Sequence, residues 1–194
     1  MDPIDARARG PSEPLRRMVD LLGQILGENI ARHRGDELYE IVETLRTVAI
    51  EERGLDELQD RIADLSLNQL EGVLRSYTGY FHLANIAEQV EIARINRERE
   101  WRATREKPRA ESVAAAVESL VDEGWDADRL YELLTRLSVE PTLTAHPTEA
   151  RRKTLLDIQQ RIAKVLMIFQ QRNPTDLELD RLRESLRREV EVMF

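Results

Sequence analysis

The chain contains no cysteine among its 194 residues, which excludes disulfide bridges and thiolate metal sites. It also has no apolar run approaching the roughly 18 residues that a membrane-spanning helix needs. The first residues, Met1 to Arg7, lack the apolar segment of a signal peptide. These absences fit a cytoplasmic protein that does not enter the membrane. Lysine is scarce as well, with 3 lysines against 26 arginines, and we attribute that bias to genome composition.

The charge balance is acidic, with 29 basic and 37 acidic residues and a net charge of −8. A protein that binds nucleic acid generally needs a basic face, so this balance disfavours nucleic acid as a partner. It does not exclude an anionic substrate, because a local cluster of cations can outweigh the sign of the whole molecule.

Apolar residues recur at helical spacing along most of the chain, so the segment is expected to be mainly α. The first helix should stop at Gly35 and bury one face made of Met18, Leu21, Leu22, Ile25, Leu26 and Ile30. Further helices are predicted up to about Gly54, over 56–64, over about 66–100, over 111–123 and over 126–137. The long helix is predicted from the periodic run Leu67, Leu70, Leu74, Tyr77, Phe81, Ala84, Ile86, Val90 and Ala93, which no proline interrupts.

Two helix starts carry the capping-box pattern, in which a hydroxyl side chain is followed three positions later by Glu or Gln. They are Ser66 with Gln69 and Thr175 with Glu178. The last helical pattern reaches Phe194 without a stop signal, and we interpret it as a chain that ends inside a helix. We find no repeat and no clean interdomain linker, so residues 1–194 are treated as one helical region.

The spacing of apolar residues departs from the helical period only once, near residues 139–145, where a short β-prone run contains Pro141. A proline there suits the first residue of a strand or an edge strand. Pro147 then favours a turn, and Thr148 can cap a following helix. His146 would therefore lie between the end of a strand and the start of a helix, in a position typical of catalytic groups in α/β barrels.

The other candidate polar groups are expected to be structural. His33 falls in the last turn of a helix, where an imidazolium is favoured by the helix dipole. His82 lies mid-helix between Phe81 and Leu83 and is expected to be satisfied at a helix contact. Seven cations lie among acids in residues 94–109, and they are expected to form a solvated helix end rather than an anion site.

The run Leu143-Thr144-Ala145-His146-Pro147-Thr148-Glu149-Ala150-Arg151-Arg152-Lys153-Thr154 resembles the histidine active-site signature of phosphoenolpyruvate carboxylase. The segment Phe81-His82-Leu83-Ala84-Asn85-Ile86-Ala87-Glu88-Gln89-Val90 is similar to the helix that precedes that signature in the family. A looser match is Leu38-Tyr39-Glu40-Ile41-Val42-Glu43-Thr44-Leu45-Arg46. The three matches occur in the family's order and span most of the chain.

The resemblance implies an enzyme that joins bicarbonate to phosphoenolpyruvate and releases oxaloacetate and phosphate, an anaplerotic reaction feeding the tricarboxylic acid cycle. It implies a phosphoenolpyruvate/pyruvate-type α/β barrel, of which this chain is the N-terminal portion with one barrel strand near 139–145. It also implies Mg²⁺ or Mn²⁺, held by ligands outside this segment, and a homotetramer. The isolated chain is then expected to be inactive.

By the same resemblance, His146 is the catalytic residue. Bicarbonate first attacks phosphoenolpyruvate to give carboxyphosphate and an enolate, and His146 then takes the proton from the carboxyl group of carboxyphosphate. Arg151 and Arg152, just inside the predicted helix, are candidates for binding the anionic substrate. Successive helical residues point about 100° apart, so these cations cannot all face one ligand.

Two alternatives come from other classes of protein. A histidine-phosphotransfer bundle needs an exposed histidine on a continuous helix, which Pro147 next to His146 argues against. A truncated, non-catalytic helical interaction protein would keep the apolar stripes and bind no substrate. The sequence does not decide which effectors regulate the enzyme.

Overall fold

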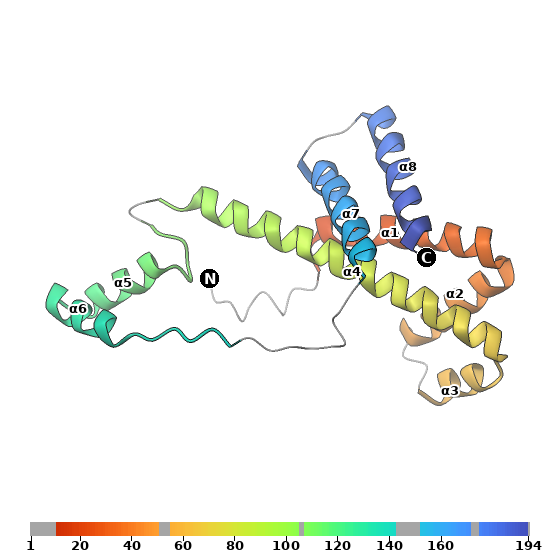
Figure 1. The fold of residues 1–194 in the computed structure, drawn as a ribbon, viewed down its shortest axis with the longest axis horizontal. Helices are drawn as coiled ribbons and strands as arrows, with labels where there is room; N and C mark the ends of the chain where they lie inside the picture. The colour runs from red at the N-terminus through yellow and green to blue at the C-terminus, as the bar shows by residue number, and fades with distance from the viewer. Residues whose placement is uncertain (1–10, 51–54, 105–106, 143–151, 172–174, 194) are drawn as a thin grey trace. The chain divides into compact units, whose positions relative to one another are not determined.

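A computed structural model describes residues 11–50, 55–104, 107–142, 152–171 and 175–193. These residues form helices and no strand. The helices are α1 (Glu13–Arg34), α2 (Asp36–Ile50), α3 (Leu55–Ala63), α4 (Leu67–Arg102), α5 (Val113–Asp122), α6 (Ala127–Arg136), α7 (Lys153–Gln171) and α8 (Asp176–Met193) (Figure 1). The chain divides into two compact units: one holds Met1–Glu91 with Arg151–Phe194, and the other holds Ile92–Ala150.

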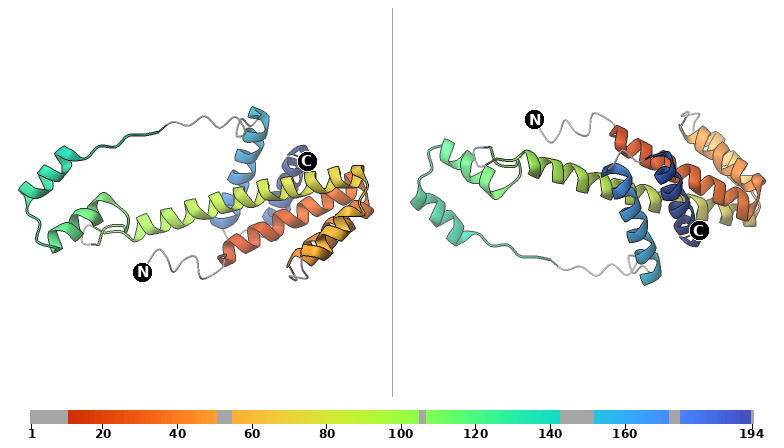
Figure 2. Two further views of the ribbon diagram at one scale, coloured as in Figure 1. Left: turned by 90° about the horizontal axis from the view of Figure 1, so that it is seen from below. Right: turned by 90° about the horizontal axis from the view of Figure 1, so that it is seen from above.

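The core of the first unit is built on α1. All six residues of its predicted apolar face are buried: Met18, Leu21, Leu22, Ile25, Leu26 and Ile30. Side chains of α2, of α4 up to Glu91, of α7 and of α8 complete the same apolar cluster. The helices α7 and α8 pack side by side, and α8 also packs against α1 (Figure 2). The helix predicted from the first apolar stripe is thus confirmed, with its apolar face buried.

The helix predicted over about 66–100 is confirmed as α4, but three residues in the first half of its apolar run are exposed. Leu67 and Leu74 are 85% and 61% exposed, and Phe81 is 60% exposed. The residues that enter the core lie on a neighbouring face of the helix: Gly72, Val73, Ser76, Leu83, Ile86, Ala87 and Val90. The helix carries two apolar stripes in its first half, and only one of them has a partner among the described residues.

Local signals fix the helix ends as predicted. In both capping boxes the hydroxyl accepts the helix N–H while Glu or Gln reaches back, as Ser66 does with Gln69 and Thr175 with Glu178. Gly35 ends α1 with φ of 88°, in the left-handed region that a residue without a Cβ adopts most readily. Ser12, which no pattern singled out, caps the start of α1 by accepting the N–H of Leu15.

The strand expected near 139–145 is not formed in its described part. Residues 139–142 have no regular secondary structure, and residues 143–145 lie outside the described residues. A β-strand exists through hydrogen bonds to a neighbouring strand. No other described segment is β, so Val139 to Thr142 have nothing to pair with.

The second unit contains the end of α4 and the short helices α5 and α6. Ser112 and Asp126 cap the two short helices by accepting the N–H of Ala115 and Arg129. The Arg129 guanidinium lies 4.2 Å from the centroid of the Trp125 ring. Neither short helix has a buried residue. Across the described residues, no helix is long and apolar enough to cross a membrane.

Candidate active site

The predicted active-site segment, residues 143–154, is described only at its end. His146 and Arg151 lie outside the described residues, and so does Thr148, the predicted helix cap. Arg152 and the two residues after it are described. The catalytic role of His146 therefore stays a prediction from the sequence.

Arg152 precedes helix α7 and is not inside it, contrary to the prediction. Its carbonyl oxygen accepts the N–H groups of Leu155 at 2.9 Å and Leu156 at 3.2 Å, so Arg152 takes the N-cap position. Lys153 is the first helical residue. The helix begins where the apolar spacing that leads to Ile158 begins, because packing rather than a capping side chain decides its start.

The side chains of Arg152 and Lys153 are both exposed, and neither forms an ion pair with a described residue. They lie at a helix N-terminus, where unpaired N–H groups and the helix dipole favour anions. A guanidinium can bind phosphate or carboxylate through two parallel hydrogen bonds. This end of α7 has the charge and donors to attract an anionic substrate.

Apolar packing holds the part of helix α7 that follows its N-terminus. Ile158, Ile162 and Leu166 are buried, and they join Leu186 and Val190 of α8 in the core cluster. The spacing of four residues puts the three α7 side chains on one face. These contacts anchor α7 in the core of the first unit, directly after Arg152.

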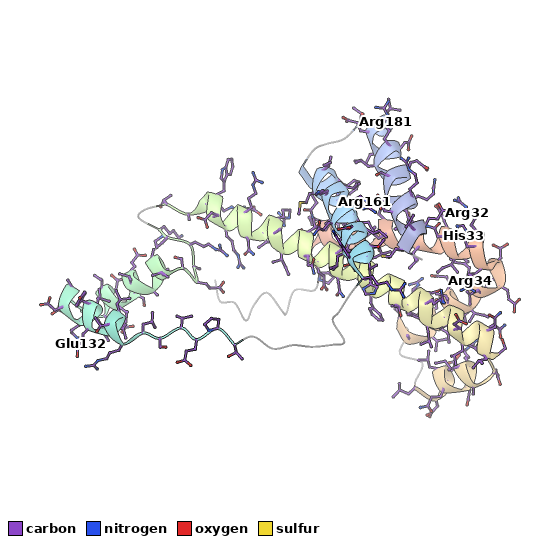
Figure 3. All side chains as sticks on the ribbon, in the orientation of Figure 1. Arg32, His33, Arg34, Glu132, Arg161 and Arg181 are labelled. Atoms are coloured by element: carbon purple, nitrogen blue, oxygen red, sulfur yellow. The ribbon has the colours of Figure 1, made fainter. Side chains whose placement is uncertain are left out.

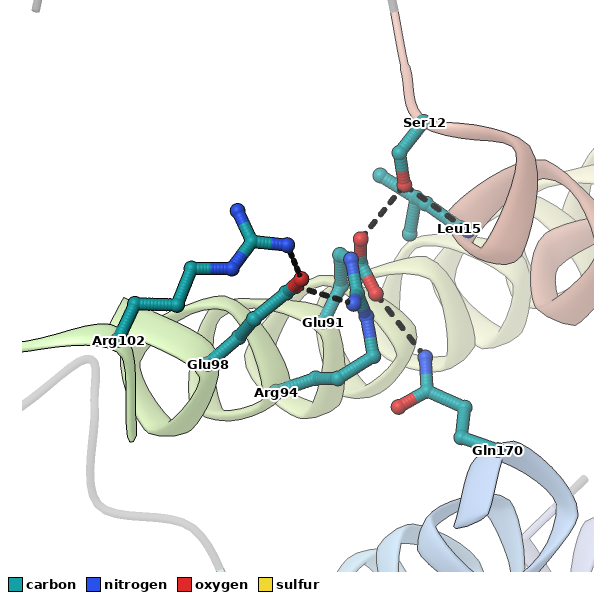
Figure 4. Close-up of polar contacts among 7 residues, drawn as sticks. All are labelled: Ser12, Leu15, Glu91, Arg94, Glu98, Arg102 and Gln170. Carbon is teal, nitrogen blue, oxygen red and sulfur yellow. Dashed lines mark hydrogen bonds and ion pairs between the residues drawn. The ribbon is translucent and has the colours of Figure 1, made fainter. Parts of the chain in front are cut away.

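A buried carboxylate adds a polar anchor for α7. Glu91 of α4 is only 3% exposed. The Ser12 hydroxyl donates to its Oε1 at 2.7 Å, and the Gln170 amide donates to its Oε2 at 3.0 Å (Figure 4). Burying a carboxylate is costly unless such donors replace water. Glu91 therefore ties the start of α1 and the last turn of α7 to the same point on α4.

Sequence reasoning missed this anchor because both partners are 79 positions away from Glu91. One signal could have identified it. Glu91 follows Leu83 and Ala87 at a spacing of four, so it falls on the face of α4 that is buried. A charged residue in phase with a core stripe needs a partner.

Ion pairs tie α8 to its two neighbours. His33 lies in the last turn of α1, as predicted (Figure 3). Its Nε2 is 3.0 Å from a carboxylate oxygen of Glu191. Arg187 pairs with Glu28 at 2.8 Å, and hydrogen bonding to that carboxylate raises the pKa of the guanidinium. Arg161 of α7 donates to Glu189 of α8 at 2.7 Å, which raises its pKa in the same way.

The remaining sequence candidates are structural. His82 is half-buried in α4 and has an interaction partner, which agrees with the predicted structural role. In the second unit, Glu98 pairs with Arg94 at 3.0 Å and also with Arg102 (Figure 4). Arg99 and Arg109 likewise pair with acids. The prediction of a solvated, charge-paired helix end is confirmed for these four arginines.

The described part of the chain offers no metal centre. No three histidine, aspartate or glutamate side chains within it lie together as ligands. Hard divalent cations such as Mg²⁺ prefer several oxygen ligands in octahedral geometry. The divalent cation that the resemblance implies therefore does not fit the described residues.

Comparison with known proteins gives one family. A family profile described as phosphoenolpyruvate carboxylase matches residues 15–194. The phosphoenolpyruvate carboxylase of Rhodothermus marinus is 45% identical over 84% of this chain, and that of Thermus thermophilus is 39% identical over 76%. The enzyme of Azorhizobium caulinodans is 33% identical over 98% of the chain.

The match is uneven in length. It covers 18% of the Rhodothermus marinus and Thermus thermophilus proteins and 21% of the Azorhizobium caulinodans protein. The chain thus spans about a fifth of the length of these relatives. Because the family profile extends over nearly all of its residues, the chain belongs to the phosphoenolpyruvate carboxylase family.

Proposed function

We propose that this chain is the N-terminal part of a phosphoenolpyruvate carboxylase, a cytoplasmic enzyme that forms oxaloacetate and phosphate from phosphoenolpyruvate and bicarbonate. The observation that carries the proposal is the family match over residues 15–194, which includes the whole signature from Leu143 to Thr154. The bound divalent cation would be held by residues elsewhere in the polypeptide. The homotetramer implied by the resemblance belongs to the same proposal.

In this proposal His146 is the group that moves a proton. It removes the proton from the carboxyl group of carboxyphosphate, so that CO₂ is released next to the enolate. An imidazole suits this step because its unperturbed pKa of about 6.5 lets it accept and return a proton near neutral pH. Pro147 follows directly after it, and a residue before proline disfavours helical backbone, so the histidine is expected at a turn.

Arg151 and Arg152 are proposed to bind the phosphate or carboxylate of the reacting anion. The exposed position of Arg152 at the start of α7 supports this role, because its side chain and the helix N-terminus attract the same charge. Consecutive residues point in different directions, so one of the two is expected to dominate binding.

The isolated chain is proposed to be inactive. A barrel enzyme needs eight strands and on the order of 200 residues or more. The described residues form only helices. Substrate groups that His146 does not contact would have to be bound by the rest of the polypeptide.

The test compares two proteins. One is the isolated chain, and the other is a chimera in which residues 15–194 replace the matched segment of the Rhodothermus marinus relative. Oxaloacetate formation is measured with phosphoenolpyruvate, bicarbonate and Mg²⁺. The chimera is expected to be active and the isolated chain inactive. In the chimera, His146→Asn should lower oxaloacetate formation by about 100-fold or more, or divert the reaction to pyruvate.

The matched control is His33→Asn, which makes the same chemical change at the end of α1. It should leave the activity of the chimera unchanged. Equal oxaloacetate formation with and without His146 would overturn the assigned role. An inactive chimera would favour the alternative that the chain comes from a truncated, non-catalytic helical interaction protein.

A further inference from the structure

The first unit contains a groove of about 530 Å³ between α1, α2 and α4. Gly23 and Gly27 of α1 form one wall, and Tyr77 and Tyr80 of α4 contribute to another. The two glycines differ in the space beside them. A Cβ placed on Gly23 would meet no atom within 4 Å, whereas one on Gly27 would come within 2.9 Å of the Tyr39 ring.

An aromatic cluster borders the groove on α4. The Phe81 ring packs edge-on against Tyr80, with ring centroids 5.8 Å apart, and lies 6.5 Å from the Tyr77 ring. Phe81 itself is largely exposed, as is Leu74 seven residues earlier. That spacing places both on one face of the helix, next to the groove. An exposed apolar surface of this kind marks a site of contact with other protein.

Two polar side chains of the groove, Arg46 and Tyr77, already have partners within the protein. Arg46 donates two hydrogen bonds to the same oxygen of Glu43, at 3.0 and 2.7 Å, so its charge is compensated. The Tyr77 hydroxyl donates to the carbonyl of Val42 at 3.4 Å. Arg46 is the one cation among the described residues that line the groove, so an anionic ligand would find no free counter-charge there. Apolar side chains on a helix would fill the hollow and cover Phe81 at the same time.

We propose that this surface, formed by the groove with Phe81 and Leu74, docks an amphipathic helix from the part of the enzyme outside the matched segment. The inference rests on the proposed function. The occupant is taken from the same polypeptide because the chain matches only 18–21% of its relatives' length, so about four-fifths of such a polypeptide lies elsewhere. If the rest of the polypeptide covers this surface, the exposure of Phe81 and Leu74 on α4 is explained.

Site-specific thiol labelling tests the docking directly, because the chain has no cysteine of its own. Phe81→Cys is introduced into the isolated chain and into the chimera, and labelling by a maleimide is followed by peptide mass spectrometry. We expect labelling at least tenfold slower in the chimera. Arg32→Cys, exposed on α1 outside the groove, is the control and should label equally fast in both proteins.

A second variant places an added side chain inside the groove. Gly23→Leu should leave the melting temperature of the isolated chain no lower, because the added side chain has open space. In the chimera it competes with the docked helix and should lower the melting temperature by about 3 °C or more. Arg32→Leu adds the same side chain to α1 outside the groove and should have no such effect in the chimera.

Each outcome decides the proposal. Fast labelling of position 81 in the chimera, or equal slowing at positions 81 and 32, overturns it. Slow labelling in the isolated chain together with a dimeric mass would mean that a second copy occupies the surface, which also overturns it. If the chimera does not fold, cysteine at the aligned position of the intact Rhodothermus marinus enzyme gives the same readout.

Labelling also separates this inference from the proposed function. Protection of position 81 in an inactive chimera would support docking while the catalytic assignment fails. An active chimera in which position 81 stays accessible would support the catalytic assignment and overturn the docking.

Discussion

Glu91 shows how a single buried charge can set the position of a helix. It replaces its lost hydration with donors from Ser12 and Gln170, which come from opposite ends of the chain. Because Ser12 also accepts the N–H of Leu15, one hydroxyl both caps α1 and binds α4. The carboxylate thereby links α1, α4 and α7 through hydrogen bonds in addition to their apolar contacts.

Removing this carboxylate should destabilise the first unit. Glu91→Ala leaves the amide of Gln170 and the hydroxyl of Ser12 without their acceptor, and we expect the free energy of unfolding to fall by about 1–3 kcal/mol. Urea unfolding followed by circular dichroism measures the change. Glu88→Ala, on an exposed face of the same helix, is the control. Equal stability of the two variants would contradict the assigned anchor.

Tyr77 should make stability depend on alkaline pH. Burial raises its pKa above the ordinary value of 10.0, and the Glu43 carboxylate adds to this effect. As pH rises, the unfolded chain loses this proton first, so the contribution is complete below pH 10 and declines above it toward the folded-state pKa. The advantage of the wild type over Tyr77→Phe should therefore shrink as pH rises from 9 to 11.

Urea unfolding at several pH values checks this expectation. Tyr131→Phe, where the ring is exposed on α6, is the control for loss of a phenol. A difference between wild type and Tyr77→Phe that stays constant from pH 9 to 11 would show that the folded structure does not perturb this group.

At the scale of the helix, two glycines of the first unit should respond to alanine in opposite directions. A Cβ on Gly72 would lie 2.6 Å from Cδ2 of the buried Leu38, where α4 and α2 approach closely. Overpacking of this kind costs about 1–3 kcal/mol, more than the helix gains from alanine. At Gly23 the Cβ meets nothing, so alanine should stabilise by about 0.5–1 kcal/mol.

The measurement is the free energy of unfolding of Gly72→Ala and Gly23→Ala beside the wild type. The two variants share one chemical change within the same unit, so a general effect of alanine cancels. If both variants are stabilised, the close approach of α4 and α2 at Gly72 is not a feature of the folded protein.

What the sequence predicted well at this scale was local. The first apolar stripe had only one possible face, and Met18, Leu22 and Ile25 are buried as expected. The capping box at Ser66 depends on residues three positions apart and was also correct. The long helix α4 carries two apolar stripes, and periodicity alone does not tell which one meets the core. Phe81 belongs to the periodic run that predicts the helix and yet is exposed.

At the scale of the whole molecule, the candidate site was predictable only as a motif. The run around His146 identified the family, but residues 143–151 lie outside the described part of the chain. The contacts that position α7 join residues far apart in sequence, such as Gln170 with Glu91, and no local pattern predicts them. A strand near 139–145 required a partner strand, and the described residues supply none.

The absence of burial in α5 and α6 leads to a prediction about the dynamics of the isolated chain. Each helix has ten residues and no buried side chain, while α1 buries seven residues. Helices this short are marginal in water unless tertiary packing supports them. Backbone amides of α5 and α6 should therefore exchange hydrogen about 100-fold faster or more than those of α1 and α7, because opening them breaks few apolar contacts. Hydrogen exchange followed by mass spectrometry resolves these segments in one experiment, with α1 as the internal standard. Protection of α5 and α6 equal to that of α1 would mean that their caps at Ser112 and Asp126 and local contacts suffice to hold them without a packed core.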